Sequence, residues 1–186
     1  MDGQILLWLQ DNLRNPVLDA VFVFFTYLGN AGIIWGIVAT VLILIKATRK
    51  AGVCCFIACF MVAILNEGII KHLVNRPRPF TEIDGLSILI RAPGSSSFPS
   101  GHTATAFAVT TILFLMLPKK YSFIALVVAG CISFSRMYVG VHYPTDVLGG
   151  LISGIVCGFM GFFTGSHIYD RSVDKGKDKE EIKGES

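Results

Sequence analysis

Apolar residues in this chain are concentrated in six long runs, which polar or glycine-containing segments separate. The runs cover residues 17–28, 31–45, 51–70, 103–117, 122–134 and 147–163. A helix that crosses a bilayer needs roughly 20 mainly apolar residues, with a range of about 17 to 25. The pattern therefore predicts an all-α integral membrane fold, built as a bundle of six transmembrane helices.

The first two runs are short for a membrane crossing. The segment Gly29-Asn30-Ala31-Gly32 between them is a turn signal and favours two separate helices. One long helix over residues 17–45 is the alternative that the sequence leaves open.

The segments outside the runs have three different characters. Residues 5–13 mix apolar with polar side chains before Pro16, which is typical of an amphipathic helix at the membrane interface. Residues 71–101 form a loop between the third and fourth helices that is far longer than most helix connections, and such loops are usually functional or disordered. Residues 170–186 are rich in Lys, Glu, Asp and Gly. We therefore expect a membrane domain over residues 1–169 and a disordered cytoplasmic tail over residues 170–186.

Composition agrees with a membrane protein and excludes other classes. Of the 186 residues, 53% are hydrophobic and 16% are charged, and the mean hydropathy of +0.63 is high for a soluble domain. The net charge of +3 is too small to indicate a nucleic-acid partner. The five cysteines all lie inside apolar runs without metal-ligand spacing, so we expect reduced thiols and no metal site.

Basic residues in short loops favour the cytoplasmic side of a membrane. Five lie on the side of the tail, namely Lys46, Arg49, Lys50, Lys119 and Lys120, and five on the other side, namely Lys71, Arg76, Arg78, Arg91 and Arg136. Because the two counts are equal, they indicate the orientation of the protein in the membrane only if the second group has another role.

Three short stretches indicate such a role, because they place ionisable residues at the ends of apolar helices. They cover residues 71–79, 99–102 and 135–146. Two helices separate the second stretch from the third, so both lie on the same face of the membrane. Lys71, Arg78 and Arg136 would then converge with few carboxylates to balance them, and an anionic phosphoryl group is the simplest ligand for them. Taken singly, each of these residues is better explained as a membrane-surface anchor.

Two histidines complete this constellation. His142 lies four residues before Asp146, so the carboxylate can bind one imidazole nitrogen and leave the other free as a nucleophile. A lone His142 would more simply be a hydrogen-bonded structural residue, but His102 supplies the proton that a leaving group needs. Ser100 and Gly101 lie where a helix begins and can hold an anion there, although a plain helix cap is the alternative for Ser100.

Together the stretches resemble the signature motifs of the type 2 phosphatidic acid phosphatase superfamily, which also contains vanadium haloperoxidases. The first motif, Lys-x6-Arg-Pro, matches Lys71, Arg78 and Pro79, and the second, Pro-Ser-Gly-His, matches Pro99 to His102. The third, Ser-Arg-x5-His-x3-Asp, matches residues Ser135, Arg136, His142 and Asp146.

This resemblance implies that His142 attacks phosphorus to form a phosphohistidine, that Asp146 orients it, and that His102 protonates the leaving group. The implied phosphate-binding residues are Lys71, Arg78, Ser100, Gly101 and Arg136. It implies no metal or other cofactor, and a cell-membrane protein whose active site faces the periplasm or exterior.

The expected substrate is a lipid phosphate or diphosphate in the bilayer. Undecaprenyl diphosphate is the lead, because the chain is small and Arg76 and Arg91 lie outside the motifs, free to bind a second phosphate. Phosphatidylglycerophosphate and phosphatidic acid are the alternatives, and a non-enzymatic lipid-binding or transport protein is a remote one. Glu67 lies one turn before Lys71 and is a candidate partner for it. The sequence indicates no oligomeric state.

Overall fold

A computed structural model of the chain describes residues 2–184, with side chains up to residue 175, and this part of the chain contains helices but no strands. The α-helices are α1 (Asp2–Leu13), α2 (Pro16–Leu28), α3 (Ile33–Leu44), α4 (Arg49–Val62), α5 (Lys71–Val74), α6 (Pro79–Glu82), α7 (Gly101–Met116), α8 (Lys119–Tyr138) and α9 (Pro144–Gly184). Two short 3₁₀ turns, η1 (Asn30–Gly32) and η2 (Lys46–Thr48), and a π-helical segment, η3 (Ala63–Ile70), lie between them.

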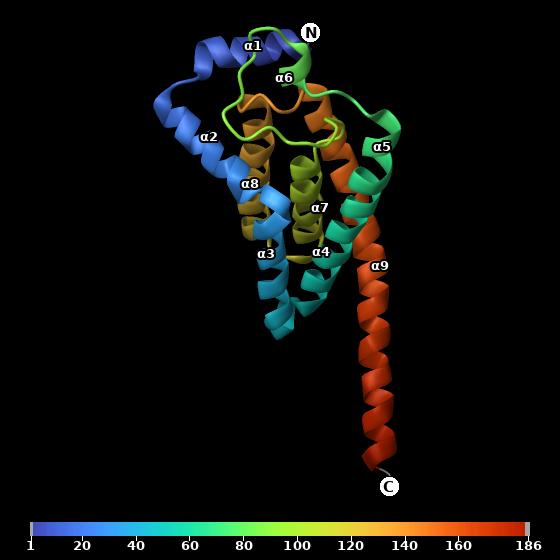
Figure 1. Cartoon of the computed structure of the whole chain (residues 1–186). Helices are drawn as coiled ribbons and strands as arrows, with labels where there is room; N and C mark the ends of the chain where they lie inside the picture. Colours follow the sequence, from blue (N-terminus) through green and yellow to red (C-terminus); the bar gives the residue numbers. More distant parts are fainter. Residues whose placement is uncertain (1, 185–186) are drawn as a thin grey trace.

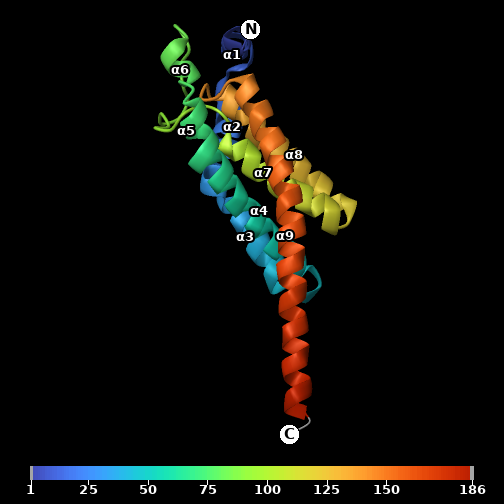
Figure 2. The same ribbon diagram turned by 90° about the vertical axis from the view of Figure 1, so that its right-hand side faces the viewer.

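The helices form an elongated bundle with two different ends (Figures 1 and 2). One end, which we call the loop end, carries α1, α5, α6 and the irregular segment between α6 and α7. The turns that join α3 to α4 and α7 to α8 lie toward the opposite end, and α9 extends well beyond the rest of the bundle there (Figure 1). The helix α9 runs without a break from Pro144 to Gly184, so it includes most of the charged segment that begins at residue 170. Because the structure shows no boundary at residue 170, the division of the chain there stays a prediction.

Three helical stretches are long and apolar enough to cross a membrane, namely Lys46–Glu82, Lys119–Tyr138 and Pro144–Lys175. A fourth candidate is the pair of α2 and α3, which meet at a bend of 47°, and α7 is a shorter apolar helix. The protein is thus an all-helical membrane protein. These spans establish fewer crossings than the six predicted from the apolar runs.

The first two apolar runs form two helices, which answers the question that the sequence left open. Asn15 caps the start of α2, since its side-chain oxygen accepts from the backbone N–H groups of Val17 and Leu18. At the break, Ala31 and Gly32 have positive φ angles of 50° and 67°, which the right-handed helix does not allow. A bend of 47° keeps α2 and α3 roughly end to end, so they do not fold back on each other as an antiparallel hairpin.

Small residues allow α9 to pack closely against α7 and α4. A Cβ atom added at Gly150 would lie 2.5 Å from the carbonyl oxygen of Ser100, and one added at Gly161 would lie 2.6 Å from the Cβ of Ala58. In a bilayer the hydrophobic effect does not drive helices together, so close packing of this kind is a main source of stability. The five cysteines are unpaired thiols, as predicted.

At the loop end, α1 covers the irregular segment that follows α6. Leu6 and Leu9 are buried in a cluster with Leu86 and Tyr143. Trp8 is 56% exposed on another side of the helix. A helix therefore forms over the predicted segment, and its buried face packs on the loop that carries part of the candidate site. Its place at the membrane interface stays a prediction.

Candidate active site

The three predicted stretches meet at the loop end around a cavity of about 500 Å³. Six of the eight predicted site residues line it, namely Lys71, Arg78, Gly101, His102, Arg136 and His142. Ser100 and Asp146 are fully buried beside it. Three cations and two imidazoles thus share one pocket, although they come from three separate stretches of the chain.

His142 lies in the short turn between α8 and α9. Gly140, at φ 81°, allows the chain to reverse there, and Pro144 begins α9. The Nδ1 atom of His142 is 3.5 Å from Oδ2 of Asp146. The same carboxylate oxygen accepts from the Ser97 hydroxyl at 2.5 Å and from the Tyr143 backbone N–H at 2.8 Å. Asp146 is therefore held firmly on the side that faces the imidazole.

The other ring nitrogen of His142 points to Arg78. A guanidinium nitrogen of Arg78 lies 3.3 Å from Nε2, and it also donates to the carbonyl oxygen of Val141 at 2.9 Å. Because a guanidinium can only donate, Nε2 acts as an acceptor and the proton resides on Nδ1, toward Asp146. Burial lowers the pKa of His142 to about 3, against an opposing effect of the nearby Asp146 carboxylate. The imidazole is therefore neutral at neutral pH, with the lone pair of Nε2 directed to the cation cluster.

The remaining cations are each held by a polar partner. Lys71 is 7% exposed, and its Nζ atom lies 2.7 Å from a carboxylate oxygen of Glu67, which confirms the predicted pairing one turn apart. Ser95 accepts from both Lys71 and Arg78, at 3.2 Å in each case. Arg136 donates to the Thr26 hydroxyl at 2.7 Å. Apart from Glu67, no carboxylate lines the cavity within the part of the chain described, so the cluster retains an excess of positive charge.

His102 is oriented by a residue that the sequence did not single out. Its Nε2 atom lies 3.0 Å from the side-chain oxygen of Asn30, in the η1 turn between α2 and α3. The only signal in the sequence was the turn segment at residues 29–32, which identified a helix break and not a partner for a histidine. The break therefore has a second role, since it brings a polar side chain to His102, which lines the cavity.

Ser100 precedes α7, but its hydroxyl does not cap that helix. It accepts from the Thr103 hydroxyl at 3.0 Å, and the backbone N–H of Ser100 donates to the carbonyl oxygen of Asp146 at 3.0 Å. The alternative of a plain helix cap is therefore wrong. Ser100 instead ties the second motif to the third.

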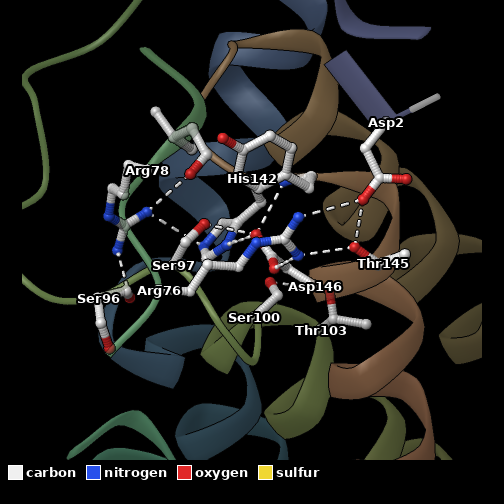
Figure 3. A network of polar contacts seen from close by, with 12 residues as sticks. Asp2, Arg76, Arg78, Ser96, Ser97, Ser100, Thr103, His142, Thr145 and Asp146 are labelled. Carbon is white, nitrogen blue, oxygen red and sulfur yellow. Dashed lines mark hydrogen bonds and ion pairs between the residues drawn. The ribbon is translucent and has the colours of Figure 1, made fainter. Parts of the chain in front are cut away.

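Arg76 and Arg91 lie outside the cavity. Arg76 donates to Oδ1 of Asp146 and to the Thr145 hydroxyl, both at 2.7 Å, and lies 3.3 Å from Asp2 (Figure 3). Arg91 is exposed. The structure gives no support to the expectation that these two arginines bind a second phosphate, because the terminal nitrogens of Arg76 bind other side chains and neither arginine lines the cavity. The expectation stays a prediction.

Within residues 2–175, no three His, Cys, Asp or Glu side chains lie close enough together to hold a metal ion. The charged groups that face the cavity are mainly nitrogen cations, which bind anions. The donor set of the cavity therefore suits a phosphoryl group.

Comparison with known proteins gives the family. The sequence model of the PAP2 superfamily matches residues 51–166, which include all eight predicted site residues. The chain is 32% identical to the undecaprenyl-diphosphatase of Sulfolobus acidocaldarius over 77% of its own length and 68% of that protein. It is 35% identical to the undecaprenyl-diphosphatase BcrC of Bacillus subtilis, over 87% of its own length and 81% of the relative.

A solved structure supports the same assignment. The crystal structure of a transmembrane PAP2-type phosphatidylglycerolphosphate phosphatase from Bacillus subtilis superposes with a TM-score of 0.72 and 28% identity, covering 90% of this chain and 85% of the other. The fold, the three motifs and the matched residues agree, and the chain therefore belongs to the PAP2 superfamily.

Proposed function

We propose that this phosphatase hydrolyses a lipid phosphate or diphosphate through a phosphohistidine formed at His142. The observation that carries the proposal is the state of His142: a neutral imidazole with Nδ1 toward Asp146 and Nε2 facing a cluster of cations. A neutral nitrogen with an available lone pair is a nucleophile, and the cations stabilise the charge on a phosphoryl group.

In the first half of the reaction, the Nε2 lone pair attacks phosphorus and the bond between phosphorus and the leaving oxygen breaks. His102 donates a proton to that oxygen. The phosphorylated imidazole then carries a positive charge, which Asp146 offsets through Nδ1–H. In the second half, water attacks the phosphohistidine, the P–N bond breaks, and inorganic phosphate leaves while His102 regains its proton.

The phosphate would be bound by Lys71, Arg78, Arg136, the Ser100 hydroxyl and the backbone N–H of Gly101. Arg78 contacts Nε2 directly at 3.3 Å, so an incoming phosphoryl group would lie between the two and take over the guanidinium donors. Lys71, Arg78 and Arg136 are each less than 10% exposed. In such a dry site their charges act more strongly on the reacting phosphate than they would in water.

The shape of the cavity favours a lipid over a soluble phosphate ester. Its far side is lined by apolar or small residues of α3, α4 and η3, namely Gly36, Phe56, Cys59, Val62 and Ala63. A polar headgroup would bind at the cation cluster, and the first part of an apolar chain would contact this side.

Undecaprenyl diphosphate is the lead substrate, because two relatives at 32% and 35% identity bear the name undecaprenyl-diphosphatase. Phosphatidylglycerophosphate is the main alternative, since the similar solved structure acts on a lipid of that class. Phosphatidic acid is a third candidate. The placement of Arg76 outside the cavity removes one argument for a diphosphate and leaves the relatives as its support.

In the membrane, the six apolar helices α2, α3, α4, α7, α8 and α9 would build the bundle, with α1 at the interface. The loop end would face the periplasm or the exterior. Lys46, Arg49, Lys50, Lys119 and Lys120 would then lie on the cytoplasmic side together with the segment from residue 170.

The test is a comparison of phosphate release by the purified protein in detergent from undecaprenyl diphosphate, phosphatidylglycerophosphate and phosphatidic acid. Wild-type protein should release phosphate from at least one of them, and an acid-labile, alkali-stable phosphoprotein should accumulate on rapid quenching. His142→Ala should abolish both signals. The matched control is His167→Ala, at an exposed histidine in the middle of α9, far from the cavity. Turnover at the wild-type rate in His142→Ala would exclude the mechanism.

A further inference from the structure

Arg76 contacts four side chains that belong to two other segments of the chain, α1 and the start of α9 with the residue before it. Its guanidinium donates to Asp146 and Thr145 at the start of α9, and its other terminal nitrogen lies 3.3 Å from Asp2 in α1. The guanidinium carbon also lies 3.9 Å from the centroid of the Tyr143 ring. Thr145 in turn donates to Asp2, which closes the network (Figure 3).

The two oxygens of Asp146 have different partners. Oδ2 faces Nδ1 of His142, the Ser97 hydroxyl and the Tyr143 backbone N–H. Oδ1 is bound by Arg76 at 2.7 Å. The Arg76 contact therefore fixes the rotation of the carboxylate from the side opposite the histidine.

Arg76 also changes the charge that His142 experiences. The Asp146 side chain is fully buried and that of Arg76 is 29% exposed, so the pair lies partly shielded from water and its attraction is stronger than at an open surface. A carboxylate that is neutralised by Arg76 attracts an imidazolium less strongly. Asp2 opposes this effect, because it draws part of the arginine charge to itself.

We propose that Arg76 is a positioning residue, which orients the Asp146 carboxylate toward His142 and partly neutralises the negative charge of Asp146. Asp2 of α1 in turn partly neutralises the positive charge of Arg76. This inference rests on the proposed phosphatase mechanism, in which Asp146 orients His142. It gives α1 a connection to the catalytic centre, since the helix that covers the loop end also holds the outermost member of this chain of contacts.

Several other charged or titratable groups surround the pair and are unchanged by the test. They are Arg78 beside α6, Arg136 in α8, His102 in α7, Lys71 and Glu67 near α5, and Tyr143 before α9. Because they are common to all variants, a difference between variants reports Arg76 and Asp2 alone.

The test measures kcat and KM against pH for the full-length protein with one lipid substrate. In Arg76→Gln, kcat should fall about 10- to 100-fold with a smaller change in KM. The acid limb of kcat/KM should move to higher pH by about one unit, because Asp146 is freed to stabilise the His142 imidazolium. Arg76→Lys retains the charge, so the acid limb should return to its wild-type position, while one ammonium cannot replace all three contacts and kcat should recover only in part.

Asp2→Asn should shift the acid limb in the opposite direction. Without the Asp2 charge, Arg76 acts fully on Asp146, so the acid limb should move to lower pH. Arg171→Gln, at an exposed arginine far along α9, is the matched control for loss of an arginine charge and should leave the whole profile unchanged. Ionisation of the substrate is the same for every variant and cancels in the comparison.

An unshifted acid limb in Arg76→Gln would overturn the inference, as would a shift to higher pH in Asp2→Asn. An increase in KM alone would assign Arg76 to substrate binding instead. If Arg76→Gln does not fold, the Arg76→Lys and Asp2→Asn profiles still decide the question. In each of these cases an active wild type and an inactive His142→Ala would leave the proposed function standing, whereas an inactive wild type would overturn both.

Discussion

Nδ1 of His142 lies 3.5 Å from Oδ2 of Asp146, and the two residues are four positions apart where the chain enters α9. Two further donors, Ser97 and the backbone of Tyr143, hold the same carboxylate oxygen in place. The arrangement gives Asp146 one clear task in the proposed mechanism, which is to keep the Nδ1 proton on its own side so that Nε2 remains unprotonated.

Replacement of Asp146 by Asn tests this task. Asn has nearly the same size, but it lacks the charge and can turn its NH₂ group toward Nδ1, which would favour a proton on Nε2 and block attack. We expect kcat to fall about 10³- to 10⁴-fold, measured as phosphate release. Asp174→Asn, at an exposed position of the same helix, is the control and should retain wild-type activity. A loss of less than about tenfold would contradict the orienting role.

Burial of His142 should also appear in the pH dependence of stability. Its pKa is lowered by burial to about 3 in the folded protein, from an ordinary value of 6.5. Between these two values the unfolded chain binds a proton that the folded protein does not, so the free energy of unfolding falls as pH falls through this window. The difference in thermal midpoint between pH 7 and pH 5 should therefore be larger for wild type than for His142→Gln.

His142→Gln will have its own effect on stability at pH 7, so the quantity compared is the change with pH in each protein. Equal changes in the two proteins would show that His142 does not titrate in this window. A larger change in His142→Gln would contradict the sign of the predicted effect.

The sequence predicted well that the site residues converge, because this prediction depends only on motifs at helix ends and on short residue spacings. Each motif lies at the end of an apolar helix, and two helices between the second and third motifs return the chain to the same face. Pairing of His142 with Asp146 and of Lys71 with Glu67 follows from a spacing of four residues, which is close to one helical turn. These contacts did not depend on how distant segments pack.

Contacts between distant segments were not predictable in the same way. Arg76 and Arg78 are two positions apart, and the resemblance to the first motif distinguished Arg78 as the one at the site, but nothing in the sequence indicated the partners of Arg76. Those partners are Asp2, which is 74 positions away, and Asp146, which is 70 positions away. The partner of His102 is likewise 72 positions away. The turn at residues 29–32 predicted a helix break, but it did not predict the size of the bend between α2 and α3, which is 47°.

The cation cluster predicts a reaction that does not need added metal. Lys71, Arg78 and Arg136 all line the cavity. In the proposed mechanism their charges would supply the stabilisation that a divalent ion gives in other phosphoryl-transfer enzymes. The initial rate of phosphate release should stay within about twofold when EDTA is present, and added Mg²⁺ should not raise it. Loss of activity in EDTA that Mg²⁺ restores would contradict a phosphate-binding site that works without metal. Arg136→Ala should lower the rate both with and without EDTA.

The close packing of α9 against α7 gives a prediction for stability that is separate from the chemistry. A Cβ atom at Gly154 would overlap the carbonyl oxygen of Ala104 and lie 3.0 Å from its Cα atom, and backbone atoms cannot move aside as a flexible side chain can. Gly154→Ala should therefore force the helices apart and lower the free energy of unfolding by about 1–3 kcal/mol. At Gly130 in α8, an added Cβ would meet no atom within 4 Å. Gly130→Ala should leave stability unchanged or raise it by up to about 1 kcal/mol, because Ala favours a helix more than Gly does. Thermal unfolding in detergent measures both variants, and equal midpoints would show that α7 and α9 are not in close contact at Gly154.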